Sequence, residues 1–496
     1  MPSSVAGPNG GRLSALAARN GGRFGLAALV AILLLGLGLR LDYAIEGQAP
    51  VFDAKAYARI AAHLEAGDGF TAGRRATQPS TNYSPGLPLL VAGIYAVTGG
   101  VNGELARIVL ALIAALAVPF TYLLGRRLGG VAAGLIGAAA VAVYPALLEY
   151  GGMLMSEPLA ATLLAAGVLA LLWAGDGRRV DGEPGDTGSG TGTWWRWLLA
   201  GALLGALSLV RPEYLAVSLL LALLVAARGV WLSFVTHRLT KDNHAPAGLT
   251  KDNHAERGGL SWRRSLGAAA LVLVGIVVVL APWTVRNAVA LHRFVPVSTG
   301  GGQVLFAGTY LPSGGDPEKV GAEVVERHSE LFAPRAVQNL RLEQILARLA
   351  HHRYPELEAD EALSKMGKEQ LWNGITEKPL EYAGFVAAKI GRVWAHGPRD
   401  VMREELWEAL HWALLGFGLL GLAVLLRRRR WEAALIAAVF LAITLVTAVT
   451  VASPRRVLVM LPLLAACAGF GVVWLDAQSL RLGPPGQTDP KPAPDS

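Results

Sequence analysis

The sequence has little charge and a single cysteine. Asp, Glu, Lys and Arg make up 17% of the 496 residues, whereas soluble domains carry about 25%, and hydrophobic residues make up 53%. We therefore interpret the chain as a membrane protein rather than a soluble domain. Cys467 lies within an apolar run, so no intrachain disulfide can form. Burial explains this residue better than a role as a nucleophile or thiolate ligand.

The basic residues lie mainly at the ends of apolar runs. The net charge is +8, but there is no basic stripe of the kind that binds nucleic acid. Charge placed in this way orients a membrane protein instead. Residues 1–23 are polar and basic, and the apolar run that follows is too long for a signal-peptide core and lacks a clear cleavage site. We expect this run to be an uncleaved anchor.

We predict an all-α polytopic membrane protein with about ten transmembrane helices, because many apolar runs approach the roughly 20 residues that cross a hydrocarbon core. The predicted spans are 24–43, 104–125, 130–148, 157–174, 195–211, 213–228, 265–283, 407–426, 431–451 and 455–476. With Arg12, Arg19 and Arg23 in the cytoplasm, the later basic clusters fall on the same side. These clusters lie at 126–127, 178–179, 228–264 and 427–430. We therefore expect both termini to face the cytoplasm, with the chain in the cell (inner) membrane.

The segment 85–99 (PGLPLLVAGIYAVTG) tests this topology. It contains two prolines and three glycines and is short for a span. If it crossed the membrane fully, every later basic cluster would move to the outer side. We therefore interpret it as a re-entrant or juxtamembrane helix.

The polar segments divide the chain into parts. We expect an amino-terminal transmembrane module over 1–283, an outer insert that is mostly helical over 284–406, carboxy-terminal transmembrane helices over 407–480 and a disordered cytoplasmic tail over 481–496. Within the module, the first outer loop is 44–103, and low-complexity cytoplasmic linkers occupy 175–193 and 229–264.

The second linker contains a tandem repeat, LTKDNHAPAG followed by LTKDNHAERG. Asp242, His244, Asp252 and His254 recur at a period of ten, which is compatible with metal ligands. A short duplication in a disordered loop is the better explanation, because no packed scaffold surrounds the repeat.

Ionisable residues collect at the outer ends of the predicted spans. They include Asp53, Glu157, Arg211, Glu213, Arg286, Arg455 and Arg456. Charges at membrane depth are costly, so several at one face indicate a site. A guanidinium presents a planar fork that matches phosphate oxygens, and a phosphate at the outer surface would explain arginines on that side. The alternative is that each arginine reaches the interface or pairs locally, as Arg211 can with Glu213.

The stretch 53–66 has the pattern of an amphipathic helix. Tyr57, Ile60, Ala61 and Leu64 fall on one face, and Lys55, Arg59 and His63 fall on another. Such a helix lies along the membrane interface. Asp53 at its start has two interpretations: a cap for the free N–H groups, or a base within hydrogen-bond reach of an acceptor hydroxyl.

Taken in order, five motifs resemble the membrane glycosyltransferases of the GT-C superfamily. The nearest likeness is to the dolichyl-phosphate-mannose protein mannosyltransferases (family 39) and the bacterial aminoarabinose transferases. The motifs are FDAKAYARIAAHLEAGDGF, YSPGLPLLVAGIYAVTG, AVYPALLEYGGMLMSEPL, GALLGALSLVRPEYL and APWTVRNAVALHRFVPVSTGGGQVLFAG. The resemblance covers the first seven spans well and the carboxy-terminal third loosely. It implies that the amino-terminal module is catalytic.

The resemblance implies transfer of a sugar from a polyprenyl-phosphate donor to an acceptor hydroxyl at the outer face, with inversion. In that family an acidic residue of the first outer loop is the base, and Asp53 matches its position. The candidates for binding the donor phosphate are Arg211, Arg286, Arg455 and Arg456. The candidates for other substrate contacts are Tyr57, Tyr83, Tyr144 and Asn287. The expected partners are the lipid-linked donor, a protein, lipid or glycan acceptor, and membrane lipids.

The sequence departs from the mannosyltransferases at the acidic site. They carry an Asp-Glu pair, but Ala54 follows Asp53 here, so we nominate Glu157 of the SEP motif as the second carboxylate. The alternative for Glu157 is a charge favoured by a helix N-terminus. His63 and His292 are the histidines that could join these carboxylates around a divalent metal. Because no dense ligand spacing appears, no metal or cofactor is assigned and a divalent metal is left open.

Two further alternatives remain. The glycine-rich stretch 298–308 (STGGGQVLFAG) suits either close approach of backbone to a sugar or phosphate, or a plain turn between extended segments. For the whole chain, the alternatives are a secondary transporter or lipid flippase, or a membrane scaffold that binds through the outer insert. Transport predicts ionisable residues at mid-span, and the spans have almost none.

Overall fold

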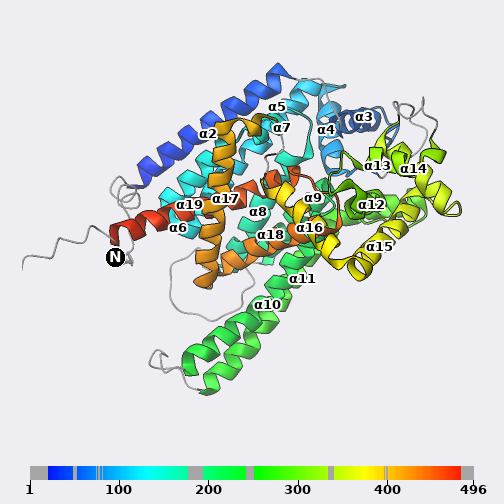
Figure 1. Ribbon diagram of the computed structural model, residues 1–496. Helices are drawn as coiled ribbons and strands as arrows, with labels where there is room; N and C mark the ends of the chain where they lie inside the picture. Colours follow the sequence, from blue (N-terminus) through cyan, green and yellow to red (C-terminus); the bar gives the residue numbers. More distant parts are fainter. Residues whose placement is uncertain are drawn as a thin grey trace, which may run out of the picture.

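The computed structural model describes residues 21–47, 53–73, 75, 79–80, 82–176, 194–241, 251–332, 340–395, 397 and 400–481. Within these residues the secondary structure is helical and contains no strand, as the composition predicted. Long apolar helices form a bundle, and a group of shorter helices lies at one end of it (Figure 1).

The helices of the amino-terminal module are α2 (Gly21–Glu46), α3 (Asp53–Glu65), α4 (Gly86–Thr98), α5 (Gly103–Ala115), α6 (Ala117–Val143), α7 (Pro145–Gly151), α8 (Ser156–Gly175), α9 (Trp194–Val210), α10 (Tyr214–Lys241) and α11 (Lys251–Leu291). The insert contains α12 (Gly301–Thr309), η1 (Leu311–Ser313), α13 (Val320–Arg327), η2 (Ser329–Leu331), α14 (Leu342–Arg353), α15 (Ala359–Glu377), α16 (Pro379–Ala395) and η4 (Asp400–Arg403). The last helices are α17 (Glu405–Arg427), α18 (Trp431–Val449) and α19 (Arg455–Arg481).

Seven helical stretches in the described residues are long and apolar enough to cross a membrane. Three shorter apolar helices are α4, α9 and the first part of α10, Tyr214–Gly229. The predicted span 104–125 is wrong in its detail, because α5 ends at Ala115 and α6 begins at Ala117. Pro119 explains the break: it has no N–H, and its ring clashes with the carbonyl of Ala115, four residues earlier. The break predicted before residue 130 is present as a kink at Gly129 and Gly130.

The helix α19 lies at the centre of the bundle, between α6 and α17, and most of its side chains are buried. Small residues permit this position. A Cβ added to Gly469 would lie 2.1 Å from the carbonyl oxygen of Ala133 on α6, and one added to Gly421 of α17 would meet the Cys467 carbonyl oxygen at the same distance. Only glycine therefore allows the backbones to approach so closely. This central position brings Arg455, the first residue of α19, beside Asp53 at the start of α3.

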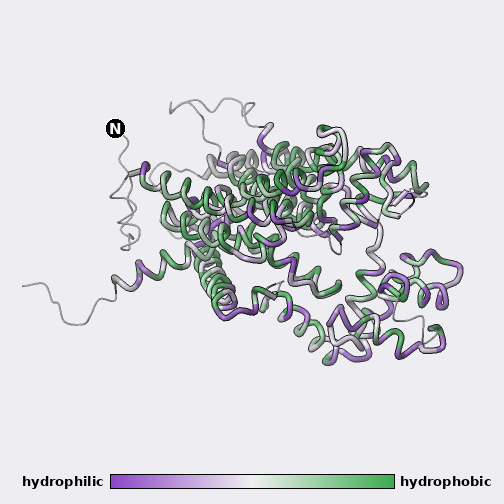
Figure 2. The backbone as a smooth tube through the Cα atoms, turned by 90° about the horizontal axis from the view of Figure 1, so that it is seen from above, coloured by the Kyte–Doolittle hydropathy of each residue, from purple (hydrophilic) through white to green (hydrophobic). Residues whose placement is uncertain are grey.

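The insert has its own hydrophobic core, which includes Phe306, Val320, Val324, Leu346 and Leu363. Its helices occupy the right-hand end of the molecule, where hydrophilic residues are frequent, whereas hydrophobic residues fill the bundle (Figure 2). It is attached closely to the bundle. Lys389 of α16 donates from Nζ to the carbonyl oxygens of Gly308 in α12 and, at 3.0 Å, of Ala448 in α18.

The segments predicted as loops or linkers are partly helical. The linker predicted at 229–264 is helical in its described part, because α10 continues to Lys241 and α11 begins at Lys251. The two helices project from the bundle as a hairpin (Figure 1). Asp242 and His244 of the repeat lie outside the described residues, as do most of linker 175–193 and nearly all of the tail. The segment 85–99 forms α4, a helix of 13 residues.

The interpretation of 298–308 as a turn between extended segments is wrong. Residues from Gly301 onward form α12, and Gly300 supplies the left-handed residue before it, at φ 92°. The Asp360 carboxylate accepts hydrogen bonds from the N–H groups of Gly302 at 2.9 Å and Gln303 at 3.3 Å. This cap satisfies the first donors of α12, so they are not open to a sugar or phosphate.

Candidate functional site

Asp53 is in the first turn of α3, the position predicted for it. Its Oδ2 accepts a hydrogen bond at 3.2 Å from Nη1 of Arg455, which is 402 residues later in the chain. The side chain of Asp53 keeps 41% of its surface exposed. The carboxylate is thus anchored by a guanidinium and still open to a substrate, and the N-terminus of α3 favours its negative charge.

Glu157 is in the first turn of α8 and its side chain is 1% exposed. Its Oε1 lies 3.0 Å from Nη1 of Arg211 and 3.5 Å from Nη1 of Arg455. Its Oε2 is buried without a hydrogen-bond partner. Arg455 therefore bridges the two predicted carboxylates, Asp53 and Glu157, although they lie on different helices.

Arg211 lies in the short turn between α9 and α10 and is held from two sides. Besides Glu157, it contacts Glu213 Oε1 at 2.9 Å through Nε and Ser156 Oγ at 3.3 Å through Nη1. The local pairing with Glu213 that the sequence suggested is present, and so is the long-range pairing with Glu157. We call Asp53, Glu157, Arg211, Glu213 and Arg455 the charged cluster. Three carboxylates face two guanidiniums in it, on four separate parts of the chain.

Tyr57 lies one turn after Asp53 on α3 and is nearly buried. Its hydroxyl is hydrogen-bonded to Ser156, the neighbour of Glu157. Burial, together with the negative charges of Asp53 and Glu157, raises the pKa of the Tyr57 phenol well above its usual range. Tyr57 is therefore a neutral phenol at the edge of the charged cluster, able to donate or accept a hydrogen bond but not to act as a base.

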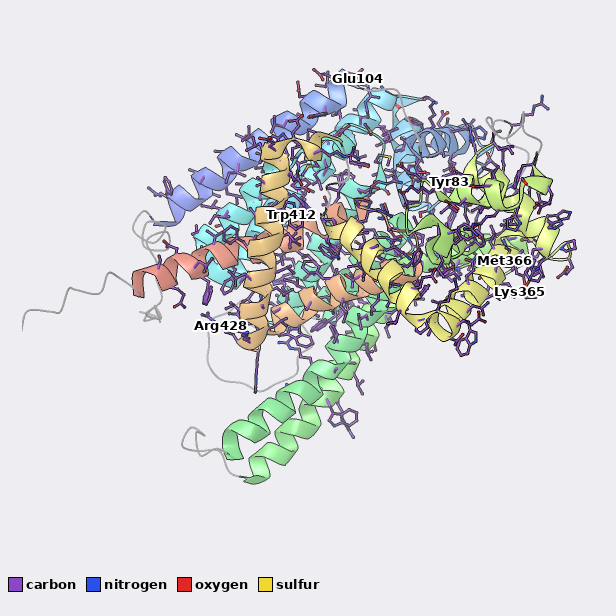
Figure 3. The ribbon with its side chains drawn as sticks, viewed as in Figure 1. Tyr83, Glu104, Lys365, Met366, Trp412 and Arg428 are labelled. Atoms are coloured by element: carbon purple, nitrogen blue, oxygen red, sulfur yellow. The ribbon has the colours of Figure 1, made fainter. Side chains whose placement is uncertain are left out.

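Tyr83 packs edge-on against Tyr57, with ring centroids 5.9 Å apart. It is half-buried and lies on the side of the first loop that faces the insert (Figure 3). Burial raises the pKa of its phenol, and Glu343 of α14 adds to the effect. The two tyrosines thus form a contact that leads from the charged cluster towards the insert.

Arg286 and Arg456 make their hydrogen bonds outside the charged cluster, although the charge of Arg456 acts on Glu213 through space. Arg286 lies against the ring of Trp283, 4.9 Å from its centroid, and donates to the carbonyl oxygens of Ser80 at 3.3 Å and Phe70 at 3.4 Å. Arg456 is 6% exposed. It donates to the carboxy-terminal end of α18, at the Thr447 and Thr450 hydroxyls and the Val451 carbonyl oxygen. Both arginines hold loops in place around the site.

Tyr144 and Asn287, which the sequence offered as substrate contacts, are fully buried. The Asn287 amide donates to the carbonyl oxygens of Val295 at 3.0 Å and Val297 at 3.1 Å. The Tyr144 hydroxyl is hydrogen-bonded to His411 Nδ1 at 2.9 Å. Each side chain already has a partner within the protein and presents no exposed surface to a substrate.

Two charged residues that the sequence analysis did not single out are fully buried. Arg40, six residues before the end of α2, donates to the carbonyl oxygens of Val141 at 2.9 Å and Ala142 at 3.1 Å, in the last turn of α6. Lys389 joins the insert to α18. An arginine inside an apolar run was a visible signal for Arg40. The sequence contains no such signal for Lys389, because a lysine on an amphipathic helix is ordinarily exposed to solvent.

The histidines proposed as metal ligands lie apart from the carboxylates. His63 Nδ1 is hydrogen-bonded to the Thr71 hydroxyl at 2.5 Å, and His292 is exposed after the end of α11. Among the described residues, no group of three His, Cys, Asp or Glu side chains is placed to hold a metal ion. Each carboxylate of the charged cluster is paired with an arginine, so we assign no step to a metal.

The comparisons with known proteins concern the fold. No family model and no curated protein matches the sequence. Two structures of an Archaeoglobus fulgidus oligosaccharyltransferase, one in the apo form and one with zinc and sulfate, each match with a TM-score of 0.50 and 15% identity. These matches cover 93% and 92% of this chain but only 51% and 49% of the oligosaccharyltransferase chain. This chain therefore spans about half the length of that protein.

A structure of ArnT from Cupriavidus metallidurans bound to undecaprenyl phosphate also matches. It covers 91% of this chain and 79% of ArnT, at 14% identity and a TM-score of 0.36. At 15% identity, the likeness to the oligosaccharyltransferase shows fold and not activity. The prediction of an all-helical polytopic membrane fold is confirmed, and this fold is similar to that of the oligosaccharyltransferase over most of the chain.

Proposed function

We propose that the protein is an integral-membrane glycosyltransferase that moves a sugar from a polyprenyl-phosphate donor to an acceptor hydroxyl. The observation that carries this proposal is the charged cluster, where Arg455 joins the partly exposed Asp53 to the buried Glu157. A carboxylate open to substrate beside guanidiniums provides a base and a phosphate partner in one place. The orientation that the basic residues predict puts this place at the extracytoplasmic face.

Asp53 is the general base in this proposal. The acceptor hydroxyl attacks the anomeric carbon of the sugar while its proton passes to an Asp53 oxygen. The bond from that carbon to the phosphate oxygen breaks, and the electron pair leaves with the polyprenyl phosphate. One displacement from the face opposite the phosphate inverts the anomeric centre. Glu157 is too buried to meet an acceptor, so its role is to position Arg211 and Arg455.

Arg455 is the arginine best placed to meet the donor phosphate. Its side chain is 34% exposed, against 15% for Arg211, and both of its contacts in the cluster are made by Nη1. A guanidinium has five N–H donors, so donors remain for phosphate oxygens. Charge develops on these oxygens as the sugar leaves, and a fixed guanidinium stabilises that charge. Tyr57, at the edge of the cluster, and Tyr83, which packs against it, are proposed as contacts to sugar or acceptor.

The test is a transfer assay on the full chain in membranes, with radiolabelled polyprenyl-phosphate sugars and identification of the labelled product. Asp53→Asn keeps size and hydrogen bonding but removes the base, and we expect transfer to fall by about 10²–10⁴-fold. Glu65→Gln is the matched control, because Glu65 is an exposed carboxylate at the other end of α3. We expect this variant to transfer sugar at the wild-type rate.

Two results would contradict the proposal. Full transfer by the inserted Asp53→Asn protein would remove Asp53 as the base. Failure of the wild-type protein with every labelled donor, together with movement of a labelled lipid across the membrane, would establish a lipid flippase instead.

A further inference from the structure

A second site lies at the end of the bundle away from the charged cluster. A groove with a volume of about 660 Å³ opens between α6, α8 and α9. Its lining includes Arg126, Arg127, Ala166, Trp173, Asp176 and Leu203. The helix α8 begins with Ser156 and Glu157 in the charged cluster and extends for 20 residues, or about 30 Å. Because the groove follows the later half of α8, it lies near the opposite membrane surface.

One end of this groove is polar and the rest is apolar. Arg127 is paired with Asp176 at 2.5 Å and with Glu432 at 3.2 Å. Arg126 is exposed, and among the described residues it has neither an ion pair nor a hydrogen bond. An apolar slot that ends at an uncompensated guanidinium is complementary to a molecule with a hydrocarbon chain and an anionic head.

The wall beside this polar end carries aromatic and basic residues together. The guanidinium of Arg196 lies 4.2 Å from the ring centroid of Trp173, and Trp195 packs against Trp173 edge-on. Arg196 is 8% exposed, and its Nε is buried without a partner. Tryptophan with arginine marks the level of lipid headgroups in membrane proteins. Arg428, at the end of α17, belongs to the same basic end of the bundle (Figure 3).

We propose that this groove binds one anionic phospholipid of the surrounding bilayer, with an acyl chain between α6, α8 and α9 and the phosphate at Arg126. Binding an acyl chain gains little from the hydrophobic effect, because the lipid tails around the protein are as apolar as the groove. The preference for one phospholipid over another therefore depends on the charge of its headgroup. A polyprenyl-phosphate carrier does not fit this role, since its phosphate would lie at the wrong end of the bundle from Asp53 and Arg455. The site is independent of the proposed transferase activity.

The experiment is native mass spectrometry of the purified full chain, exposed to equal amounts of phosphatidylglycerol and phosphatidylcholine with identical acyl chains. We expect wild-type protein to retain one phosphatidylglycerol in preference to phosphatidylcholine. Arg126→Gln should reduce that preference by about fivefold, the effect of one basic residue at a membrane surface. Arg427→Gln is the matched control, because Arg427 is also exposed at the basic end but lies outside the groove, and it should bind as wild type does.

Two variants test the apolar part of the groove. Ala166→Trp on α8 and Leu203→Trp on α9 fill it from different helices, and each should abolish the retained lipid. Unchanged retention in Arg126→Gln, or in both filling variants, overturns the proposal. Displacement of phosphatidylglycerol by an equal amount of polyprenyl phosphate also overturns it, because the groove would then belong to the carrier.

Discussion

Arg455 and Arg456 are adjacent in the sequence, yet their side chains contact different parts of the protein. Nη1 of Arg455 contacts Asp53 at 3.2 Å and Glu157 at 3.5 Å, whereas Arg456 bonds the end of α18. We therefore predict that Arg455→Gln mainly reduces sugar transfer, and that Arg456→Gln mainly reduces stability. Comparing the two variants therefore distinguishes an arginine that acts in the transfer reaction from one that stabilises the fold.

The expected loss of stability in Arg455→Gln is small. Asp53 and Arg455 are 41% and 34% exposed, so their ion pair contributes about 0.5–1 kcal/mol. The variant also removes the contact between Arg455 and the buried Glu157. Breaking a buried ion pair costs about 3–5 kcal/mol. Because Glu157 keeps Arg211 as a partner at 3.0 Å, we expect the loss of Arg455 to cost only about 1–2 kcal/mol here. Domains are stable by about 5–15 kcal/mol, so the variant remains folded. Loss of a fixed donor to the developing charge should reduce the rate by about 10²–10³-fold.

For Arg456→Gln we expect a large loss of stability and a small loss of transfer rate. Arg456 is 6% exposed and donates to three oxygen atoms at 2.7–3.0 Å. Each buried group left unsatisfied costs about 1–3 kcal/mol. The variant should therefore unfold at a distinctly lower temperature, while its transfer rate per folded molecule stays close to that of the wild type.

The assay combines thermal unfolding in detergent with initial rates of transfer from a radiolabelled polyprenyl-phosphate sugar. Arg455→Lys is an informative third variant, because an ammonium keeps the charge but cannot present the fork that bridges two carboxylates. Its rate should lie between those of the wild type and Arg455→Gln. Equal losses of rate in Arg455→Gln and Arg456→Gln would refute the reasoning, and so would an unchanged rate in Arg455→Gln.

Two further predictions concern packing and pH. Gly469→Ala places a methyl group against the Ala133 carbonyl oxygen and should lower the free energy of unfolding by about 1–3 kcal/mol, measured by thermal unfolding. Gly416→Ala is the control, because nothing lies within 4 Å of the added methyl group, and it should lower this free energy by less or raise it. Burial, and then the nearby Arg456, lower the pKa of Lys389 to about 7. The folded protein therefore binds fewer protons than the unfolded chain between this pKa and the usual lysine value of about 10.4, so stability should rise with pH across that window. Lys389→Met should lack this rise, and a wild-type stability that falls or stays level over the window contradicts the assignment.

Much of the fold follows from local sequence patterns. Apolar runs of sufficient length form helices because a membrane helix satisfies its own backbone hydrogen bonds. For this reason the described helices correspond to most of the predicted spans, and the kink at Gly129 and Gly130 coincides with a predicted loop. The break at Leu116 was missed, although the proline three residues later contained the signal. The glycine-rich stretch was misassigned, because its helix α12 depends on a cap from Asp360, 58 residues away.

The composition of the charged cluster was only partly predictable. Asp53, Glu157, Arg211 and Arg455 were all named from the sequence, and the structure brings them together. Arg286 and Arg456 were named for the donor phosphate, and Tyr144 and Asn287 for other substrate contacts, but the structure gives each of them hydrogen-bond partners outside the cluster. Arg286 and Arg456 share their residue type and their position near a span end with Arg211 and Arg455, so sequence patterns do not separate these two pairs of arginines.

The sequence by itself determined the membrane-type composition, the helical class, the order of the helices and the presence of a carboxylate at the start of α3. These properties depend on composition and on residues within a few turns of one another. Only the tertiary structure decided that Arg455 bridges Asp53 and Glu157, because these residues meet only when α19 packs into the centre of the bundle. That packing depends on close contacts at Gly469 and Gly421 between helices far apart in the chain. Contacts of that kind have no local signature, because they require the shape of both surfaces at once.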